Sequence, residues 1–302
     1  MQEVKDFSID KNIDVKTLVK QMGESGGFTS KKLAEGIEIL DDMMKDKECL
    51  KFLSFPADII ATGTRGIIRD FIKNKMFDVV ITTSGTLDHD IARSYKKYYH
   101  GSFEMNDVEL HQKGINRLGN VLVPNESYGI IVEDKMNEFL KKISEKTQEI
   151  STHELVWEMG KEMDQNSIAY WAEKNKIPVI VPGITDGAVG YQIWQFSQKN
   201  KFNLNLMKDE SLLSDLVWDA KKSGALIVGG GISKHHTIWW GQFMRGFDYA
   251  VYVTTAHEYD GSLSGARTNE AISWGKINEK AKHLTIEGDA TLILPLILAA
   301  LQ

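Results

Sequence analysis

Ala225-Leu226-Ile227-Val228-Gly229-Gly230-Gly231 is the stretch that decides the fold of this chain. A short apolar run that ends in small residues and leads into helical periodicity is typical of a β-α unit in a parallel sheet. Comparable runs recur along the chain, at residues 52–55, 79–85, 178–183, 249–256 and 284–287. The repetition predicts a sheet whose strands are separated by helices.

Helical periodicity fills the segments between these runs. We expect helices over residues 14–22, 30–45, 133–149, 154–163 and 290–301. Ser151 and Glu154 form a capping-box pattern at the start of one of them. The whole pattern predicts an α/β fold with a doubly wound, mostly parallel, Rossmann-like sheet and helices on both faces. Since no Gly/Ser-rich linker interrupts the chain, we expect one α/β domain over 51–302, preceded by an N-terminal helical extension over 1–50.

Composition excludes several classes of protein. The 302 residues are 42% hydrophobic, so the chain can bury a large core. Cys49 is the only cysteine, which rules out an internal disulfide framework and favours a reducing, cytoplasmic location. The N-terminus lacks the apolar core of a signal peptide, and Pro295 interrupts the longest apolar run, so we expect no membrane partner. A net charge of -6 argues against a nucleic-acid partner.

Residues that follow the predicted strands indicate a nucleotide site. In open α/β sheets ligands bind outside the carboxyl ends of the strands, where small residues let phosphates approach the backbone and an Asp can bind ribose hydroxyls. The Gly229 triplet does not complete a G-x-G-x-x-G motif, and any one of these glycines could serve only a turn. The residues concerned are Thr83-Ser84-Gly85, Asp88-His89-Asp90, Thr185-Asp186-Gly187, Gly229-Gly230-Gly231, Thr254-Thr255-Ala256 and Asp289-Ala290.

Lys276 is the candidate nucleophile, because Trp274 and Gly275 beside it could disfavour its charged form. A surface lysine at the end of a loop is the alternative. We expect Asp88, Asp90 and Glu270 to lie at the same rim as Lys276, where acids would suit a polyamine and Trp274 would offer a cation-π face. Asp88 and Asp90 could instead cap a helix that begins near residue 91.

A metal site is not expected. His235 and His236 are adjacent, so they rarely converge on one ion, and no third ligand follows at helical spacing. His153-Glu154 does not begin a metalloprotease motif, because Trp157 stands where the second histidine would be.

The string that contains Lys276 resembles the deoxyhypusine synthases. It runs from Thr255-Ala256 through Glu258-Tyr259-Asp260-Gly261-Ser262, Ser264-Gly265-Ala266-Arg267 and Glu270-Ala271-Ile272 to Ser273-Trp274-Gly275-Lys276. Supporting segments are 114–120, 122–126, 185–187 and 229–236. The resemblance covers about residues 52–298 and is of the archaeal type.

The resemblance implies a transferase that moves the aminobutyl group of spermidine onto one lysine of translation initiation factor 5A, with NAD as cofactor. It implies a homotetramer with active sites between paired subunits. Lys276 would form the covalent imine, and His235 could shuttle a proton. Contacts to NAD fall on Thr83, Ser84, Gly85, Asp186, Gly230, Thr255, Ala256, Asp289 and Ala290. Contacts to spermidine fall on Asp88, His89, His235, Gly261, Ser262, Glu270 and Trp274.

Three positions depart from the eukaryotic pattern, because His89, Tyr191 and Leu263 each replace an acid. The polyamine slot has therefore lost negative charge, and Asp90, Glu258 or Asp260 could anchor the distal amine instead. Aminobutyl transfer to a small diamine such as putrescine, as in homospermidine synthases, is one alternative activity. A catalytically silent NAD-binding paralogue is another. A sirtuin-like deacylase is disfavoured, because one cysteine cannot supply a four-cysteine zinc module.

Overall fold

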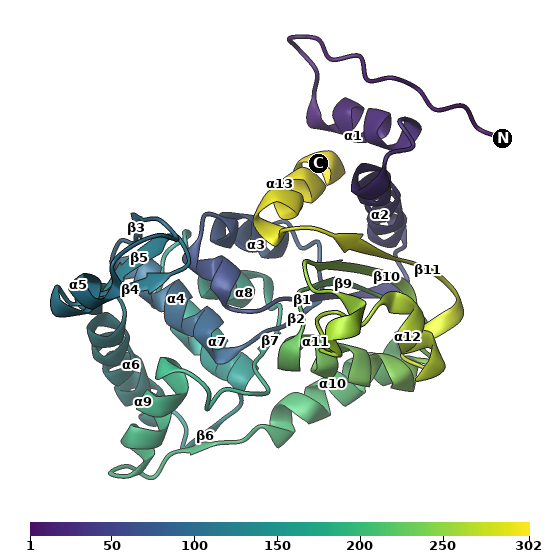
Figure 1. Ribbon diagram of the computed structural model, residues 1–302. Coiled ribbons are helices and arrows are strands. Elements are labelled where there is room, and N and C mark those ends of the chain that lie inside the picture. Colours follow the sequence, from purple (N-terminus) through teal and green to yellow (C-terminus); the bar gives the residue numbers. More distant parts are fainter. The chain divides into compact units, whose positions relative to one another are not determined.

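The computed structural model describes residues 1–302, which form two compact units (Figure 1). Unit 1 comprises Met1–Phe55, Met76–Ile81 and Leu212–Gln302, and unit 2 comprises Pro56–Lys75 and Thr82–Ser211. This division differs from the expected segments 1–50 and 51–302. The N-terminal segment belongs to the same compact unit as the C-terminal third of the chain.

Unit 1 contains five parallel strands in the order β11-β10-β9-β1-β2. Leu53 on β1 pairs with Val80 on one side and with Leu226 on the other, and Leu226 pairs in turn with Val251. All four side chains are fully buried, as expected for a parallel sheet that is covered on both faces. The strands are β1 (Cys49–Ser54), β2 (Val79–Ile81), β9 (Lys222–Val228), β10 (Phe247–Thr254) and β11 (Ile277–Glu287).

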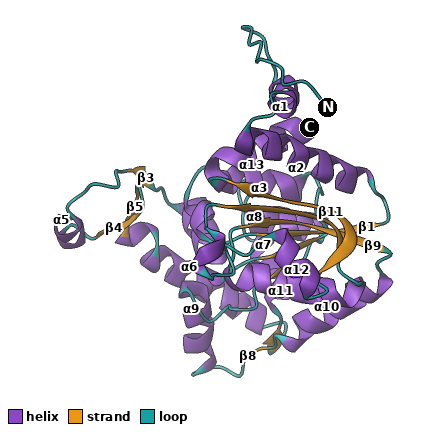
Figure 2. Ribbon diagram, turned by 45° about the vertical axis from the view of Figure 1, so that its right-hand side comes forward, coloured by secondary structure: helices purple, strands orange, loops and turns teal.

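Helices cover both faces of this sheet, which confirms the predicted fold class. Figure 2 shows α2 and α13 on one side of the strands, and α11 and α12 on the other. The helices of unit 1 are α1 (Val15–Glu24), α2 (Phe28–Lys45), α11 (Gly231–Gly241), α12 (Thr268–Ser273) and α13 (Ala290–Leu301), with short 3-10 turns η3 (Gln242–Met244) and η4 (Glu258–Asp260). The chain passes from unit 2 into unit 1 within α10 (Met207–Asp219).

Helix α2 is part of the core of unit 1. Leu40 and Met43 on this helix are fully buried. At Gly36 a Cβ atom would come within 2.7 Å of Cδ1 of Ile286 on β11, so only glycine lets the helix approach the strand this closely. The N-terminal extension is therefore required to complete one face of the sheet.

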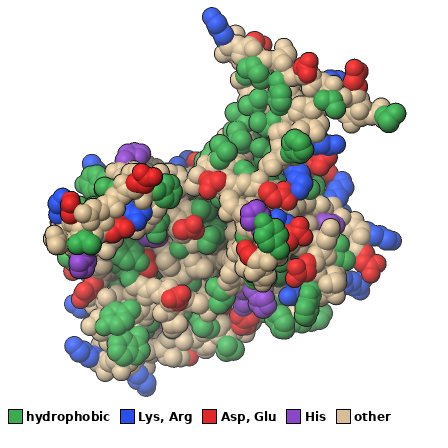
Figure 3. All heavy atoms as spheres, viewed as in Figure 1, with side chains coloured by type: hydrophobic (Ala, Val, Ile, Leu, Met, Phe, Trp, Pro, Cys, Tyr) green, Lys and Arg blue, Asp and Glu red, His purple; other side chains and the backbone are tan.

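Unit 2 is mainly helical. Its longer helices are α3 (Thr64–Lys73), α4 (Ser84–Tyr95), α5 (Asp107–Gln112), α6 (Gly129–Ser144), α7 (Thr152–Gly160), α8 (Ile168–Asn175) and α9 (Ala188–Ser197), with 3-10 turns η1 (Asp58–Ala61) and η2 (Asn125–Ser127). Its strands are the antiparallel set β3 (Tyr99–His100), β5 (Val121–Pro124) and β4 (Ile115–Leu118), the parallel pair β6 (Glu149–Ile150) and β8 (Asn203–Leu204), and β7 (Val179–Ile180). Hydrophobic side chains gather over α9 at the lower left of Figure 3, where Tyr191 and Trp194 are both more than half exposed.

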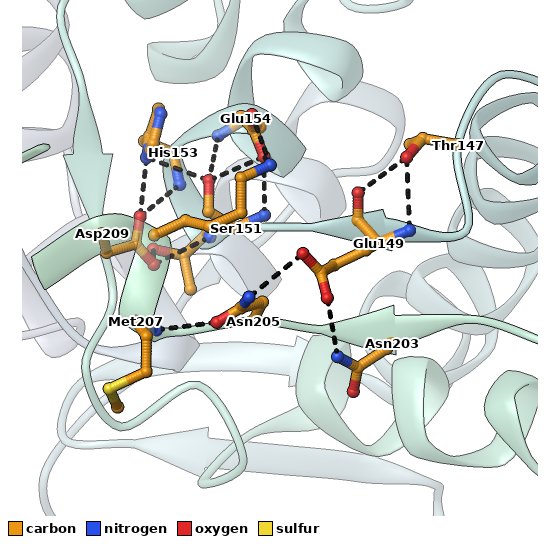
Figure 4. A network of polar contacts seen from close by, with 11 residues as sticks. Thr147, Glu149, Ser151, His153, Glu154, Asn203, Asn205, Met207 and Asp209 are labelled. Atoms are coloured by element: carbon orange, nitrogen blue, oxygen red, sulfur yellow. Dashed lines mark hydrogen bonds and ion pairs between the residues drawn. The ribbon is translucent and has the colours of Figure 1, made fainter. Parts of the chain in front are cut away.

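The predicted capping box at the start of α7 is confirmed (Figure 4). Ser151 Oγ accepts a hydrogen bond from the Glu154 amide, and the Glu154 carboxylate accepts one from the Ser151 amide. Asp209 adds a second cap, because its buried carboxylate accepts hydrogen bonds from the amides of Thr152 and His153 and from Thr152 Oγ1. These contacts satisfy amide groups that a helix start leaves without partners.

Three element boundaries differ from the prediction. Helix α4 begins directly after β2, at Ser84, so Asp88 and Asp90 lie inside it rather than before it. Helix α6 ends at Ser144, since Thr147 Oγ1 closes a turn with Glu149 that leads into β6. Strand β11 begins at Ile277 rather than 284, because its first half is polar and half exposed at the edge of the sheet, and therefore lacks an apolar pattern.

None of the helices combines the length and the apolar composition needed to cross a membrane. Cys49 on β1 is buried, and burial raises the pKa of its thiol to about 12.

Candidate functional site

A pocket of about 440 Å³ lies within unit 1, between α11 on one side and the segment from Leu263 to Lys276 on the other. Four of the predicted catalytic and substrate residues line it together: His235, Glu270, Trp274 and Lys276. The other lining residues are Lys234, Ile238, Trp239, Gln242, Tyr252, Leu263, Ala266, Arg267 and Ala271.

Lys276 is 9% exposed and is held at both sides of its backbone. Its amide donates to the Ala271 carbonyl at 2.9 Å, and its carbonyl accepts from the Phe247 amide at 3.1 Å. Lys276 therefore lies between the end of α12 and the start of β11, at the amino end of that strand. The expectation that Lys276 lies at the carboxyl rim of the sheet was wrong, because β11 begins seven residues earlier than its apolar part suggests.

Trp274 is 67% exposed, and the Lys276 Nζ lies 5.4 Å from the centroid of its ring. An aromatic face attracts a cation, so this ring is a suitable surface for a positively charged group. The predicted contact of Trp274 with a polyamine stays a prediction. Because its side chain is mostly exposed, Trp274 does not enclose Lys276 on the solvent side.

His235 lies on α11, stacked on Trp239 with ring centroids 6.1 Å apart. Burial lowers the pKa of His235, and the nearby charge of Lys276 lowers it further. Its imidazole is therefore mainly neutral near pH 7 and can accept a proton. Glu270, in the first turn of α12, supplies the carboxylate of the pocket lining.

Gly261 and Ser262 are not among the lining residues, although the loop that carries them borders the pocket. Gly261 has a positive φ of 70° at the end of η4, and Ser262 is held by its amide, which donates to Asp260 Oδ1 at 2.7 Å. Both are exposed on this loop. Their predicted contact with spermidine stays a prediction.

The carboxyl ends of β9, β10 and β11 bring five predicted cofactor residues to one edge of unit 1. The pairing of Val253 with Val228 and of Thr254 with Glu287 sets the following residues side by side. They are Gly230, Thr255, Ala256, Asp289 and Ala290. Asp289 caps α13, since its Oδ1 accepts from the Thr291 amide at 2.9 Å.

Gly230 has a packing reason to be glycine. A Cβ atom at this position would come within 2.2 Å of Ser264 Oγ and 2.5 Å of Ser264 Cα. The backbone at the start of α11 therefore touches the loop that borders the pocket. This close approach accounts for the glycine whether or not a cofactor lies against it.

A second group of predicted residues gathers inside unit 2. Ser84 begins α4, and a Cβ at Gly187 would come within 2.4 Å of Ser84 Oγ, so the loop of Asp186 and Gly187 lies against the start of α4. Ser84 Oγ is buried without a hydrogen-bond partner. The small residues Thr83, Ser84 and Gly85 together with this free hydroxyl fit a polar ligand such as a dinucleotide.

Asp88 is fully buried at the same place and caps α9. Its carboxylate accepts hydrogen bonds from the amides of Ala188 and Val189 and from the Tyr128 hydroxyl, at 2.8 to 2.9 Å. Burial raises the pKa of Asp88, and the nearby charge of Asp186 raises it further. Capping is therefore its role within unit 2, as the alternative interpretation held, although it caps a different helix from the one expected.

His89 and Asp90 are also bound within unit 2. His89 Nδ1 lies 2.8 Å from the Tyr98 hydroxyl, and burial lowers the pKa of His89 to about 4. Asp90 is 1% exposed, forms an ion pair with Arg65 at 2.7 Å, and accepts from Ser167 Oγ at 3.0 Å. With these partners Asp90 cannot serve as the free anchor suggested for a distal amine.

Lys234, Tyr252 and Arg267 are among the pocket residues to which the sequence analysis assigned no role. Lys234 directly precedes His235, so its position in the sequence could have indicated that it lies near the site. Tyr252 lies in an apolar strand run, where an aromatic residue is expected for packing alone. Arg267 was quoted as part of the motif, but nothing in the sequence indicates that its Nε and Nη1 would be buried without hydrogen-bond partners.

Two other kinds of site find no support. Ser151, His153 and Asp209 lie together in unit 2, but Ser151 Oγ and Asp209 Oδ1 both contact the same ring atom, His153 Nδ1 (Figure 4). A catalytic triad needs contacts at both ring nitrogens. No group of three or more His, Cys, Asp or Glu side chains is arranged to hold a metal ion.

Comparison with known proteins shows which family this chain belongs to. The sequence model described as deoxyhypusine synthase matches residues 17–301. This chain belongs to the deoxyhypusine synthase family. The match confirms the resemblance drawn from the Lys276 string, and it includes α1 and α2, which that resemblance had left out.

Relatives named probable deoxyhypusine synthase align over nearly the whole chain. The protein from Picrophilus torridus is 56% identical over 99% of this chain and 96% of its own length. The protein from Thermoplasma acidophilum is 56% identical over 98% of this chain and 96% of its own length. These archaeal relatives agree with the predicted archaeal type.

A solved structure shares the fold. The crystal structure of a putative deoxyhypusine synthase from Entamoeba histolytica has a TM-score of 0.68 and 23% sequence identity, and the match covers 98% of this chain and 96% of that one. Membership of the deoxyhypusine synthase family makes this chain a transferase.

Proposed function

We propose that this chain is an NAD-dependent deoxyhypusine synthase, which moves the 4-aminobutyl group of spermidine through an imine on Lys276 to a lysine of translation initiation factor 5A. The observation that carries the proposal is the position of Lys276, 9% exposed in a pocket that it shares with His235, Glu270 and Trp274. Membership of the family supports the reaction. The resemblance supports the substrates and the cofactor.

The dinucleotide would be held by the small residues that follow the strands of unit 1, Asp289 and Gly230 among them, and when bound it would supply a hydride acceptor. The neutral imidazole of His235 is suited to take the proton that the secondary amine loses on oxidation. The ring of Trp274 and the carboxylate of Glu270 would hold the cationic chain in line with Lys276.

Lys276 then acts as nucleophile. Its neutral Nζ adds to the imine carbon of the oxidised substrate and a new C–N bond forms. The bond from that carbon to the diaminopropane nitrogen then breaks, and diaminopropane leaves as an amine with the proton given up by Nζ. The acceptor lysine attacks the same carbon and Lys276 leaves in its turn, restored as a free amine. The bound cofactor would also supply the hydride that reduces the product imine, so the overall reaction would involve no net oxidation.

The charge of the pocket supports an assembly in which other residues complete the site. Three cationic side chains, Lys234, Arg267 and Lys276, line it against the single carboxylate of Glu270. Arg267 Nε lies 3.6 Å from Glu258 Oε1 and 3.9 Å from Glu287 Oε1, so its charge is partly balanced, whereas Lys234 has no carboxylate within ion-pair distance. A polycation would bind more firmly if further carboxylates faced this lining. We therefore include in the proposal a homotetramer whose active sites are shared by paired subunits. A cytoplasmic location, consistent with one buried cysteine, is also part of it.

Labelling tests this function. The protein is incubated with NAD and with spermidine labelled in its butylamine portion, reduced with borohydride, and mapped by mass spectrometry, with and without the cognate factor. We expect the label on Lys276 and its transfer to the factor's lysine. Lys276→Ala should abolish the label, whereas Lys280→Ala, which removes an exposed lysine of β11, should leave it unchanged.

Other outcomes would replace the proposal. A label on Lys276 that moves only to putrescine would indicate a homospermidine synthase-like enzyme. No label at all would indicate a silent NAD-binding paralogue.

A further inference from the structure

We propose that Lys234 is a positioning residue, which clamps the loop of residues 262–266 against α11 and thereby sets the position of Glu270 in the pocket. The proposal rests on the proposed function only where it predicts an effect on spermidine. The contact between Lys234 and the loop lies within unit 1 and does not depend on the substrate.

Lys234 is buried in an unusual way for a lysine. It is 1% exposed, its Nζ donates a hydrogen bond of 2.7 Å to the Ala266 carbonyl, and the same Nζ lies 4.2 Å from the centroid of the Tyr252 ring. No carboxylate lies within ion-pair distance of it. A buried ammonium without such a partner is costly, so its presence calls for a reason other than stability.

The hydrogen bond joins α11 to the loop at a decisive point. Ala266 closes a turn in which its amide donates to the Ser262 carbonyl at 3.2 Å. The next residue, Arg267, is the N-cap of α12, and Glu270 lies in the first turn of that helix. A shift of the Ala266 carbonyl would therefore carry the start of α12, and Glu270 with it.

Gly230 forms the second half of the same clamp. Gly230 is the N-cap of α11, and Lys234 lies just inside the start of the same helix. Gly230 leaves no room between the helix backbone and Ser264, while Lys234 holds Ala266. The loop is thus pinned at two points by the first turn of α11.

The charge of Lys234 is set by its neighbours. Burial lowers its pKa to about 8, Glu270 opposes this, and Arg267 adds to it, while Tyr252 on β10 faces it with an uncharged ring. The side chain is therefore mostly an ammonium at pH 7 and becomes neutral as the pH rises through 8. The hydrogen bond from Lys234 to the Ala266 carbonyl is therefore strongest below pH 8, where the side chain is charged.

Hydrogen exchange of the free protein tests the clamp without any substrate. In Lys234→Met we expect amides of residues 262–270 to exchange at least tenfold faster, with amides of β9 and β10 unchanged. Lys234→Arg, which keeps a cationic donor, should restore much of the protection. Lys221→Met, a surface lysine, is the control and should match the wild type. Unchanged exchange in Lys234→Met would overturn the proposal.

Kinetics separate positioning from catalysis. We expect Lys234→Met to raise the KM for spermidine at least tenfold, to change kcat less, and to keep the covalent label on Lys276. A label found on Lys234 in the wild type would overturn the proposal by making it a catalytic residue. Should the wild type not use spermidine, the proposed function fails, but the exchange result still decides the clamp.

Gly230→Ala provides an independent route should Lys234→Met not fold. Its added Cβ meets Ser264, so it should loosen the same amides of residues 262–270. Protection equal to the wild type in folded Gly230→Ala would overturn the two-point clamp.

Discussion

His89 shows how one substitution can remove a charge from an otherwise familiar motif. The resemblance places an acid at this position in eukaryotic members, whereas here a buried imidazole pairs with Tyr98 and lies 5.3 Å, centroid to centroid, from the Tyr128 ring. Tyr128 in turn donates to Asp88. The substitution therefore replaces a charge by a neutral ring within an aromatic cluster.

Because His89 is buried in its neutral form, we expect the free energy of unfolding at acidic pH to depend on it. Its pKa falls from an ordinary 6.5 to about 4 in the folded protein, so between these values the unfolded chain binds the extra proton. Stability contributed by the neutral ring is complete above pH 6.5 and is lost as the pH falls toward 4. We expect the wild type to lose on the order of 2 kcal/mol more than His89→Asn between pH 7 and pH 4.5. Urea unfolding at both pH values measures this, and parallel losses in the two proteins would contradict it.

At the scale of elements, apolar runs ending in small residues predicted the strands well. β1, β2, β7, β9 and β10 all overlap the predicted runs, because buried parallel strands must be continuously apolar. The first half of β11 was not predicted, since an edge strand can be polar and need not be continuously apolar. The same error placed Lys276 at the wrong end of its strand.

The site could be predicted only in part for a related reason. Residue types and motif spacing were enough to gather His235, Glu270, Trp274 and Lys276 in one pocket. They could not show that the Asp90 carboxylate would form an ion pair with Arg65 and accept hydrogen bonds from amides at the start of α8, because these partners come from distant parts of the sequence. They also could not show which loop a buried lysine would hold.

Asp88 offers a prediction for α9. Asp88→Ala would leave two amides and the Tyr128 hydroxyl without an acceptor, so we expect a loss of about 2–4 kcal/mol in the free energy of unfolding. Tyr128→Phe removes one donor only and should cost about 1 kcal/mol. Urea unfolding of both variants tests this, and equal losses would argue that the two amides do not depend on Asp88.

The network of Figure 4 supports a similar prediction for α7. Asp209→Ala removes the acceptor shared by Thr152 and His153, in a position that is 2% exposed, so we expect a loss of about 2–4 kcal/mol. Ser151→Ala removes one cap contact and should cost about 1 kcal/mol. Thermal unfolding followed by circular dichroism compares the two, and a smaller effect for Asp209→Ala would refute this ranking.

For the whole molecule, the cationic lining of the pocket and the exposed rings beside it raise the same question. Trp239, Phe243 and Trp274 are each 44% exposed or more, on or next to the helices that carry the site. Exposed aromatic groups of this kind are common where another protein surface packs. They fit an assembly in which a second chain covers the pocket.

Light scattering checks that assembly. We expect a particle of four times the chain mass of 34.1 kDa at micromolar concentration. Trp239→Glu, which places a charge on the exposed ring position, should shift the distribution toward smaller particles, because a charge buried at an interface is costly. A wild-type monomer would count against shared sites.

Cys49 has a practical consequence for the laboratory. A single thiol that is 4% exposed, with a pKa of about 12, will scarcely react with maleimide reagents at neutral pH. The natural chain thus serves as a background without reactive thiols. A cysteine introduced at Tyr259, which is 87% exposed on the loop bordering the pocket, would take up a fluorophore at that one place and report loop movement as ligands bind.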